Sequence, residues 1–249
     1  MLFVELTQEM QISGILSFIH NIITIFISIA ILRRAIQLKK GTYYILAIFM
    51  LFSAAGYYQI GLNYFFWVLT NDLFSYQIKV LIGTSGIGIA TLCWLYIYCD
   101  MLYKRFKKTI VSIYAIFVMI FYIYLISFLY VVPGAPIEDL IGTNIFPYEI
   151  GYSAFVLISF MTTLIITTIT TYHLAFRIMK NKESKELKWR GRFLAIGITL
   201  IMISAMLDIN APDIILLTTI IRIVGIIAIF FIYLGFVPPT WVKKFLRLE

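Results

Sequence analysis

Residues 214–236 read IILLTTIIRIVGIIAIFFIYLGF, with Asp213 directly before them and Lys243 and Lys244 soon after. Arg222 is the one charged residue in this apolar stretch. A helix needs about 20 such residues to cross roughly 30 Å of hydrocarbon. The flanking charges also orient it, because short loops rich in Lys and Arg stay in the cytoplasm. The segment therefore predicts a membrane-spanning helix that ends on the cytoplasmic side.

The charge pattern around this segment repeats along the whole chain. Lys and Arg gather in alternate gaps between apolar stretches, and these four groups hold 18 of the 20 basic residues. The other gaps and the N-terminal residues carry acids, among them Glu5 and Glu9, with Lys79 as the exception. We therefore expect the N-terminus outside, the C-terminus in the cytoplasm and an odd number of spans. The basic groups are Arg33, Arg34, Lys39 and Lys40; Lys104, Arg105, Lys107 and Lys108; Arg177, Lys180, Lys182, Lys185, Lys188, Arg190 and Arg192; and Lys243, Lys244 and Arg247.

Seven spans fit this pattern, so the chain is predicted to be an all-α, seven-helix transmembrane bundle that forms one domain over residues 1–249. The first span is expected to be an uncleaved anchor, because the N-terminal residues lack the basic start of a signal peptide. The sixth span is expected to be short. The spans are predicted at about 12–32, 43–69, 80–101, 110–132, 152–176, 193–207 and 214–236.

The composition supports a membrane protein and argues against a nucleic-acid partner. The chain is 62% hydrophobic and 13% charged, with a mean hydropathy of +0.97, whereas soluble domains average about 25% charged residues. The net charge of +8 is accounted for by the inner loops, which also attract anionic lipid head groups. We expect a multi-pass protein of the cell membrane whose first partner is the lipid bilayer.

Two spans and one loop have distinctive compositions. Gly83, Gly86 and Gly88 in the third span allow close helix packing, which predicts a central position in the bundle. The fourth span is apolar and aromatic throughout, which favours a lipid-facing position. The segment 133–151, the longest expected outside, is predicted to fold over the mouth of the bundle.

Arg222 is the most costly residue to place in a membrane. It is predicted about 13 Å below the outer surface, where an arginine costs at least ~2.5 kcal/mol. It keeps its proton and must find hydrogen-bond acceptors. Thr218 and Thr219 share its helix face. The same arithmetic places Asp208 at the outer end of the sixth span, so no carboxylate in another span is expected at the depth of Arg222.

Other polar residues are predicted near Arg222. His20 and Asn21 are expected roughly 12 Å below the outer face, and Gln59 and Asn63 in the outer half of the second span. Together with Asp208, Tyr57 and Tyr58 they predict a cavity open to the outside. Two interpretations remain: Arg222 bonds to amides and carbonyls and locks the helices together, or it binds an anionic or carbonyl-bearing ligand. The candidate ligand-binding residues are Arg222, Thr218, Thr219, His20, Asn21, Gln59, Asn63 and Asp208.

The sequence predicts neither a metal site nor an enzyme. The chain's two histidines, His20 and His173, are far apart, and Cys93 and Cys99 lie on different faces of one helix, so no metal-ligand spacing occurs. We find no nucleophile with a base and no paired carboxylates at one depth. No catalytic residue and no cofactor is therefore expected.

The exit of the last span reads FIYLGFVPPTWVKKFLR over residues 231–247. It resembles the junction at which the seven-helix input modules of archaeal and bacterial sensor histidine kinases leave the membrane. The chain given ends at Glu249, so the resemblance implies a stand-alone sensor module, or one cut from a longer chain. It also implies a receptor-like function, in which a small ligand binds from outside and a separate cytoplasmic protein is engaged through the basic loops and the C-terminus.

A transporter of small molecules or ions is the alternative, because the same polar cluster suits a binding site at the membrane midplane. Access distinguishes the two functions. A cavity reachable from the cytoplasm favours the transporter, and one reachable from outside alone favours the receptor.

Overall fold

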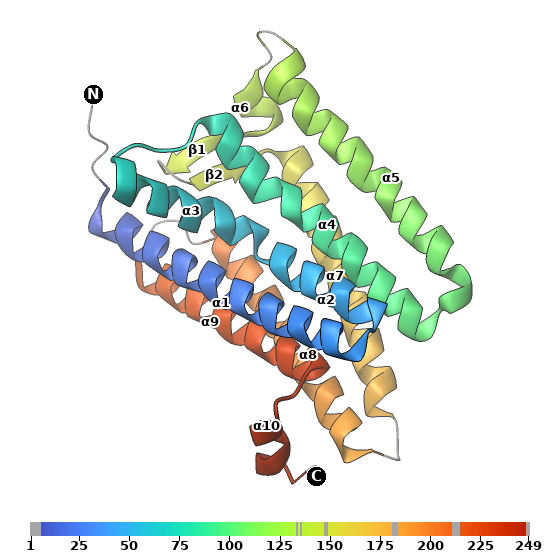
Figure 1. Ribbon diagram of the computed structural model, residues 1–249. Helices are drawn as coiled ribbons and strands as arrows, with labels where there is room; N and C mark the ends of the chain where they lie inside the picture. Colours follow the sequence, from blue (N-terminus) through green and yellow to red (C-terminus); the bar gives the residue numbers. More distant parts are fainter. Residues whose placement is uncertain are drawn as a thin grey trace.

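The computed structural model describes residues 6–132, 134, 136–146, 149–180, 184–210 and 215–247. Six of its helices are long and apolar enough to cross a membrane, and a bent pair of helices makes a seventh if it counts as one span. The protein is therefore an all-α membrane bundle with several spans, as predicted (Figure 1). Glu5, Lys182, Asp213 and Ile214, which the sequence analysis used, lie outside the described residues.

The helices form a ring with one helix outside it. In order around the ring, α1, the pair α2 and α3, α4, α7, α8 and α9 contact one another, and α9 closes the ring against α1. The helix α5 lies on the outside, mainly against α4 (Figure 1). The elements are α1 (Gln8–Leu38), α2 (Gly41–Ser53), α3 (Ala55–Thr70), α4 (Tyr76–Leu102), the 3-10 helix η1 (Lys104–Phe106), α5 (Lys107–Ile126), the π-helix η2 (Ser127–Val131), α6 (Ile137–Leu140), β1 (Gly142–Phe146), β2 (Glu149–Tyr152), α7 (Ala154–Met179), α8 (Lys185–Asn210), α9 (Ile215–Phe236) and α10 (Thr240–Phe245).

The glycines of α4 let it pack at the centre, as predicted. A Cβ atom on Gly86 would overlap the side chain of Ala55, and one on Gly83 would overlap Gln59. The most apolar window of α4 is 56% buried, the highest value among the candidate spans, whereas that of α5 is 22% buried, the lowest. The low burial of α5 is what a lipid-facing helix requires.

The second span differs from the prediction of one helix over 43–69. It consists of α2 and α3, which meet at Ala54 with a bend of 57°. The hydroxyl of Ser53 donates to the carbonyl of Met50 at 2.8 Å, and the small residues Ala54, Ala55 and Gly56 follow. Sharp kinks occur at small Gly and Ser residues as well as at proline, so this run of small residues accounts for the break.

The sixth span also differs, because α8 is not short. It begins at Lys185, eight residues before the predicted start at Phe193 (193 − 185), and ends at Asn210. Lys, Glu, Arg and Leu favour helix, so the charged segment simply continues the helix beyond the apolar part. The guanidinium of Arg190 donates to the carbonyl of Phe236, which attaches this extension to the end of α9.

The segment between α6 and α7 forms a two-stranded antiparallel sheet, a local feature that the sequence analysis did not predict. In it β1 pairs with β2, with Gly142 opposite Tyr152 and Asn144 opposite Ile150. The side chain of Ile150 is buried in an apolar cluster that also contains residues of α4, α5 and α7. The expectation that this segment folds over the bundle is confirmed, since residues of β2 line the central cavity described below.

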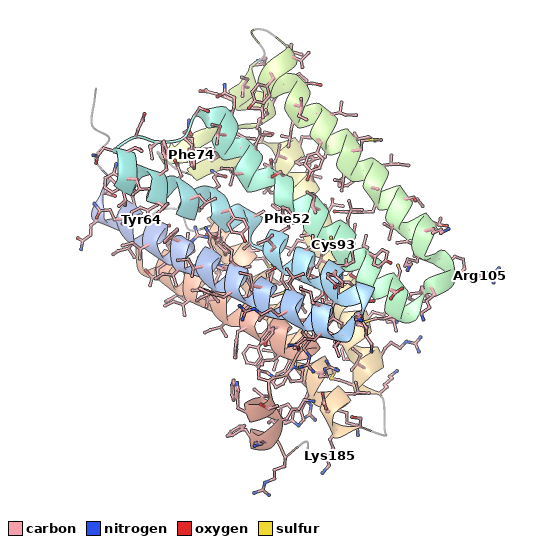
Figure 2. The ribbon with its side chains drawn as sticks, viewed as in Figure 1. Phe52, Tyr64, Phe74, Cys93, Arg105 and Lys185 are labelled. Carbon is pink, nitrogen blue, oxygen red and sulfur yellow. The ribbon has the colours of Figure 1, made fainter. Side chains whose placement is uncertain are left out.

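The basic groups lie at one end of the bundle. Figure 2 shows Arg105 and Lys185 at the end opposite to Tyr64 and Phe74. At the basic end the carboxylate of Asp100 accepts from Lys107 at 2.7 Å and from Thr42 at 3.0 Å. The starts of α2 and α5 are thus both joined to the end of α4.

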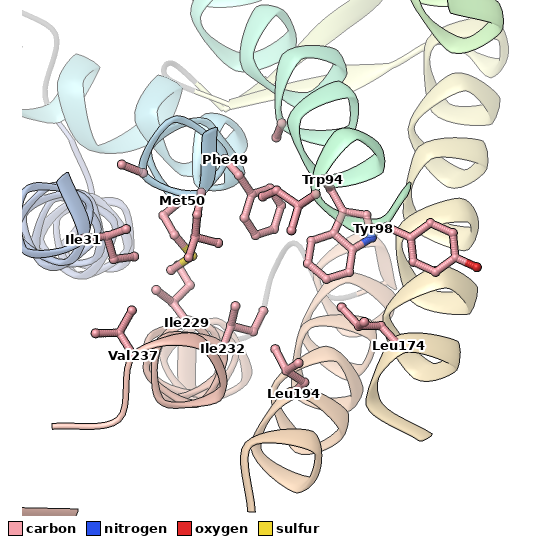
Figure 3. Packing of buried hydrophobic residues seen from close by; sticks show 14 of the residues in the cluster. Ile31, Phe49, Met50, Trp94, Tyr98, Leu174, Leu194, Ile229, Ile232 and Val237 are labelled. Carbon is pink, nitrogen blue, oxygen red and sulfur yellow. The ribbon is translucent and has the colours of Figure 1, made fainter. Parts of the chain in front are cut away.

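A large apolar cluster fills the bundle toward the basic end. Trp94 lies in its centre, in contact with rings on both sides: the ring of Phe49 lies 5.3 Å away and that of Phe236 6.0 Å away. Residues of α1, α2, α4, α7, α8 and α9 all contribute (Figure 3). Because the cluster joins all members of the ring, it is the main packing unit of the fold.

Candidate functional site

The ring of helices encloses a cavity of about 490 Å³. Residues of α1, α2, α3, α4, α7, α8, α9 and β2 line it, and most of the wall is apolar. Cavities of about 300–1,000 Å³ with apolar walls and a few polar groups are typical of small-molecule sites. The size and the lining therefore suit an organic molecule better than a bare ion.

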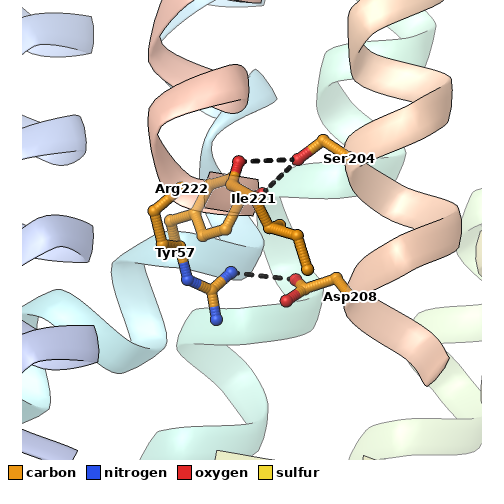
Figure 4. Close-up of polar contacts among 5 residues, drawn as sticks. All are labelled: Tyr57, Ser204, Asp208, Ile221 and Arg222. Atoms are coloured by element: carbon orange, nitrogen blue, oxygen red, sulfur yellow. Dashed lines mark hydrogen bonds and ion pairs between the residues drawn. The ribbon is translucent and has the colours of Figure 1, made fainter. Parts of the chain in front are cut away.

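Polar side chains gather at the part of the cavity between α1, α3, α8 and α9. The imidazole of His20 lies against the ring of Tyr57, with centroids 4.3 Å apart. The hydroxyls of Tyr57 and Ser204 lie 3.2 Å apart, and Ser204 donates to the carbonyl of Ile221 at 3.1 Å (Figure 4). Asp208 also borders the cavity. We call His20, Tyr57, Ser204 and Asp208 the polar end of the cavity.

Arg222 forms an ion pair with Asp208, with Nη1 and Oδ2 2.8 Å apart. Residue counting placed no carboxylate at the depth of Arg222, yet the pair with Asp208 forms across the difference in depth. In the antiparallel helices α8 and α9 the two residues are offset by only about 7 Å along the axis. Helical side chains lean toward the N-terminus of their own helix, so these two side chains lean toward each other and close the gap.

The guanidinium of Arg222 lies behind the polar end and does not line the cavity. Its side chain is 1% exposed, and its Cζ lies 4.6 Å from the centroid of the Tyr57 ring. Tyr57 and Asp208 thus stand between the positive charge and the cavity. Among the described lining residues Asp208 is the one acid, and no Lys or Arg is present. The cavity therefore meets a neutralised pair and not a free cation.

The other predicted residues separate into two groups. Gln59 lines the cavity, and its carbonyl oxygen accepts from the hydroxyl of Tyr152 at 2.8 Å. Asn21 donates to the carbonyl of Tyr57 at 3.1 Å, and Asn63 accepts from the backbone of Phe74 at 2.8 Å. Asn21 and Asn63 are buried, and neither lines the cavity. The half-buried residues that share the face of Arg222, Thr218 and Thr219, also lie outside the lining.

Sequence reasoning missed Ser204 and Tyr152, and a sequence signal was available for Ser204 alone. Ser204 lies four residues before Asp208, so the two occupy one face of α8, and this polar pair in an apolar helix was the available signal. Tyr152 reaches the cavity from β2. Its position depends on the strand pairing, for which the all-α prediction left no place.

The sheet is fastened over the cavity by polar contacts to α4. The ammonium of Lys79 donates to the side-chain oxygen of Asn144 at 2.7 Å, and the hydroxyl of Tyr76 donates to the carbonyl of Gly142 at 2.6 Å. Lys79 is 5% exposed whereas Asn144 is exposed, so the bond joins a buried side chain of α4 to the outer face of β1. These contacts hold β2, and with it Tyr152, against the cavity.

No protein-family model matches the chain, and no curated protein sequence matches it. Among the described residues, no three His, Cys, Asp or Glu side chains come together as metal ligands. The function of the cavity is therefore argued from its own geometry.

Proposed function

We propose that the protein is a receptor-like sensor of the cell membrane that binds a small, largely apolar molecule with one polar group. The proposal includes seven spans, with the N-terminus outside and the C-terminus in the cytoplasm. This orientation agrees with the four basic groups at one end of the bundle, since such groups stay in the cytoplasm. The polar end of the cavity then lies toward the outside.

The observation that carries the proposal is the lining of the cavity, which has the polar end on one side and meets the apolar cluster on the other. Phe49, Trp94 and Ile232 form part of its wall and also belong to the apolar cluster toward the basic end. In the proposed function this cluster closes the cavity toward the cytoplasmic side that the basic groups indicate. A site that is closed toward the cytoplasm suits a receptor better than a transport path.

The ligand expected from this geometry differs from the anionic one that the sequence suggested. Arg222 is paired with Asp208, so a ligand anion would meet the carboxylate before the guanidinium. The apolar body of the ligand would pack against the wall formed by α4, α7 and α9, and its polar group would face His20, Tyr57 and Ser204. A neutral amphipathic molecule meets both conditions.

Signalling through the helices α8 and α9 is part of the same proposal. These helices carry Ser204 and Asp208 at the cavity and Arg222 behind it. They are joined at the basic end by the contact of Arg190 with Phe236. A ligand that shifts one against the other would displace α10 and its basic residues. The resemblance of residues 231–247 to the exit of sensor modules supports this route to a cytoplasmic partner.

The transporter remains the second candidate because of the break between α2 and α3. Ser53, Gly56 and Tyr57 at this break line the cavity, and broken helices beside a central site are characteristic of secondary transporters. A transporter must open the cavity to the cytoplasm in part of its cycle, whereas the proposed receptor need not.

Mass spectrometry of molecules that co-purify with the protein in lipid nanodiscs tests the binding function. Ala205 borders the cavity, so Ala205→Phe should prevent an apolar molecule from binding. Ile120 lies on α5 and is 56% exposed, so the molecule should still bind to Ile120→Phe. Equal small-molecule content in the wild type and Ala205→Phe would contradict the proposal.

Sidedness of access distinguishes the receptor from the transporter. In a background with Cys93 and Cys99 replaced by Ala, Ser204→Cys would be treated with a membrane-impermeant thiol reagent from either side. Labelling from the outside alone supports the receptor. Labelling from both sides supports the transporter.

A further inference from the structure

A small niche in the polar end lies beside Gly225. A Cβ atom at this position would be 3.4 Å from Cε1 of His20, 3.4 Å from the hydroxyl oxygen of Tyr57 and 3.6 Å from that of Ser204. These are ordinary van der Waals distances. The missing side chain of Gly225 therefore leaves a space about the size of one methyl group or one hydroxyl, bordered by three polar side chains and continuous with the cavity lining.

His20 is buried in this niche without protein partners for its ring nitrogens. The residue is 1% exposed, and neither Nδ1 nor Nε2 has a hydrogen-bond partner among the described residues. Cε1, the atom nearest to the niche, lies between the two nitrogens. A neutral imidazole has one nitrogen that donates and one that accepts. A buried histidine with both unmatched is unusual in proteins, where buried polar groups are nearly always paired.

The hydroxyl chain beside His20 determines what else the niche offers. Ser204 donates its proton to the carbonyl of Ile221, so the Tyr57 hydroxyl donates to the oxygen of Ser204 in their mutual bond. Both protons are then used. The Tyr57 oxygen also takes a hydrogen bond from Arg222, so the oxygen of Ser204 is the hydroxyl oxygen that keeps acceptor capacity toward the niche. A bound group would therefore donate to the Ser204 oxygen or to the accepting nitrogen of His20, and accept from the other nitrogen of His20.

We propose that this niche binds the hydroxyl group of an uncharged alcohol whose apolar body fills the cavity; the inference rests on the proposed binding function. A hydroxyl both donates and accepts, which an ether or a ketone cannot do. A carboxylate has no proton to donate and would lie near Asp208. An ammonium group would lie near Arg222, whose Cζ is 4.6 Å from the Tyr57 ring.

Binding of two matched probes tests the proposal. Tritiated 1-decanol and tritiated methyl decyl ether would be titrated against the full chain in nanodiscs, with empty nanodiscs as the blank. The wild type should bind the alcohol about tenfold more tightly than the ether, which corresponds to about 1.4 kcal/mol. His20→Phe should reduce this preference to near onefold and leave the ether affinity in place.

Two further variants keep the test decisive if His20→Phe does not fold. Gly225→Ala fills the niche without a close contact, because no neighbour of the added Cβ lies nearer than 3.4 Å. It should weaken decanol binding about tenfold and leave the ether affinity unchanged. Ser13→Ala is the control, since Ser13 is a buried, unmatched hydroxyl on the same helix as His20 but away from the cavity lining, and the preference for the alcohol should persist.

The outcomes separate this inference from the proposed function. Saturable binding of both probes with equal affinity overturns the hydroxyl niche while the cavity remains a binding site. A preference for the alcohol that survives in both His20→Phe and Gly225→Ala also overturns it. Absence of saturable binding of either probe overturns the inference, and the co-purification experiment then decides on the binding function by itself.

Discussion

Replacing Asp208 by Asn should destabilise the protein far more than removing its partner. The side chain of Arg222 is 1% exposed and that of Asp208 is 31% exposed. Asp208→Asn leaves a buried guanidinium without its counter-charge, and breaking a buried ion pair in this way costs about 3–5 kcal/mol. Arg222→Met leaves instead a partly exposed carboxylate at the cavity wall, so we expect about half that cost.

The double variant is the most informative member of the set. With both charges removed, no buried ion remains, and apolar replacement of a whole buried pair is often neutral. Asp208→Asn combined with Arg222→Met should therefore lie within about 1 kcal/mol of the wild type. The coupling energy from this cycle should therefore reach about 3.5–7.5 kcal/mol, above the roughly 0.5–3 kcal/mol that is common for contacting residues.

Reversible unfolding in mixed micelles at increasing fractions of dodecyl sulfate measures these free energies. The pair of Lys243 and Glu186 is the control, because both partners are partly exposed: they lie 3.0 Å apart with side chains 27% and 26% exposed. Glu186→Gln should cost no more than about 1 kcal/mol. The prediction is contradicted if Arg222→Met destabilises the protein as much as Asp208→Asn does. It is also contradicted if the double variant is no more stable than the less stable of the two single variants.

Three further predictions follow from packing, polar contacts and charge. Gly86→Ala should destabilise the protein by about 1–3 kcal/mol, because the added Cβ would overlap α3. Gly56→Ala, whose Cβ would have no atom within 4 Å, should be neutral or stabilise the protein by up to about 1 kcal/mol. Thermal unfolding in detergent compares the two variants. Lys79→Met removes a hydrogen bond to β1 worth about 1.5–3 kcal/mol. Amide hydrogen exchange in β1, measured by mass spectrometry, should therefore accelerate about tenfold or more, while exchange in α9 stays unchanged. In intact cells an impermeant maleimide should label Asp72→Cys directly and Arg105→Cys only after permeabilisation; the reverse result would invert the proposed orientation.

Most of the helical architecture could be predicted from hydropathy and charge alone. In a bilayer every backbone polar group must be bonded within the segment, so a long apolar stretch has little choice but helix. The small residues Gly83, Gly86 and Gly88 likewise indicated a central helix, because close approach requires them. Local composition decides these features, so single-segment reasoning is sufficient for them.

The predictions that failed concern features that depend on contacts between segments or on the position of the membrane boundary. The bend at Ala54 arises in a run of small residues that can continue a helix or break it. The sheet of β1 and β2 lies outside the apolar stretches, where hydropathy carries no information about strand pairing. The first two turns of α8 are charged, and a count of apolar residues marks where the apolar layer ends and not where the helix does.

For the polar site, the position of each residue along its own helix could be predicted, whereas its contacts across the bundle could not. Residue counting placed His20, Gln59, Asp208 and Arg222 within the outer part of the bundle, and the structure brings three of them to the cavity. Counting treats each residue as a point at its Cα depth, whereas a long side chain leans along the axis toward its helix N-terminus. Antiparallel neighbours lean toward each other, so a carboxylate and a guanidinium about five residues out of register can still pair. That pairing removes the positive charge from the cavity, and it is the reason the proposed ligand is a neutral alcohol and not an anion.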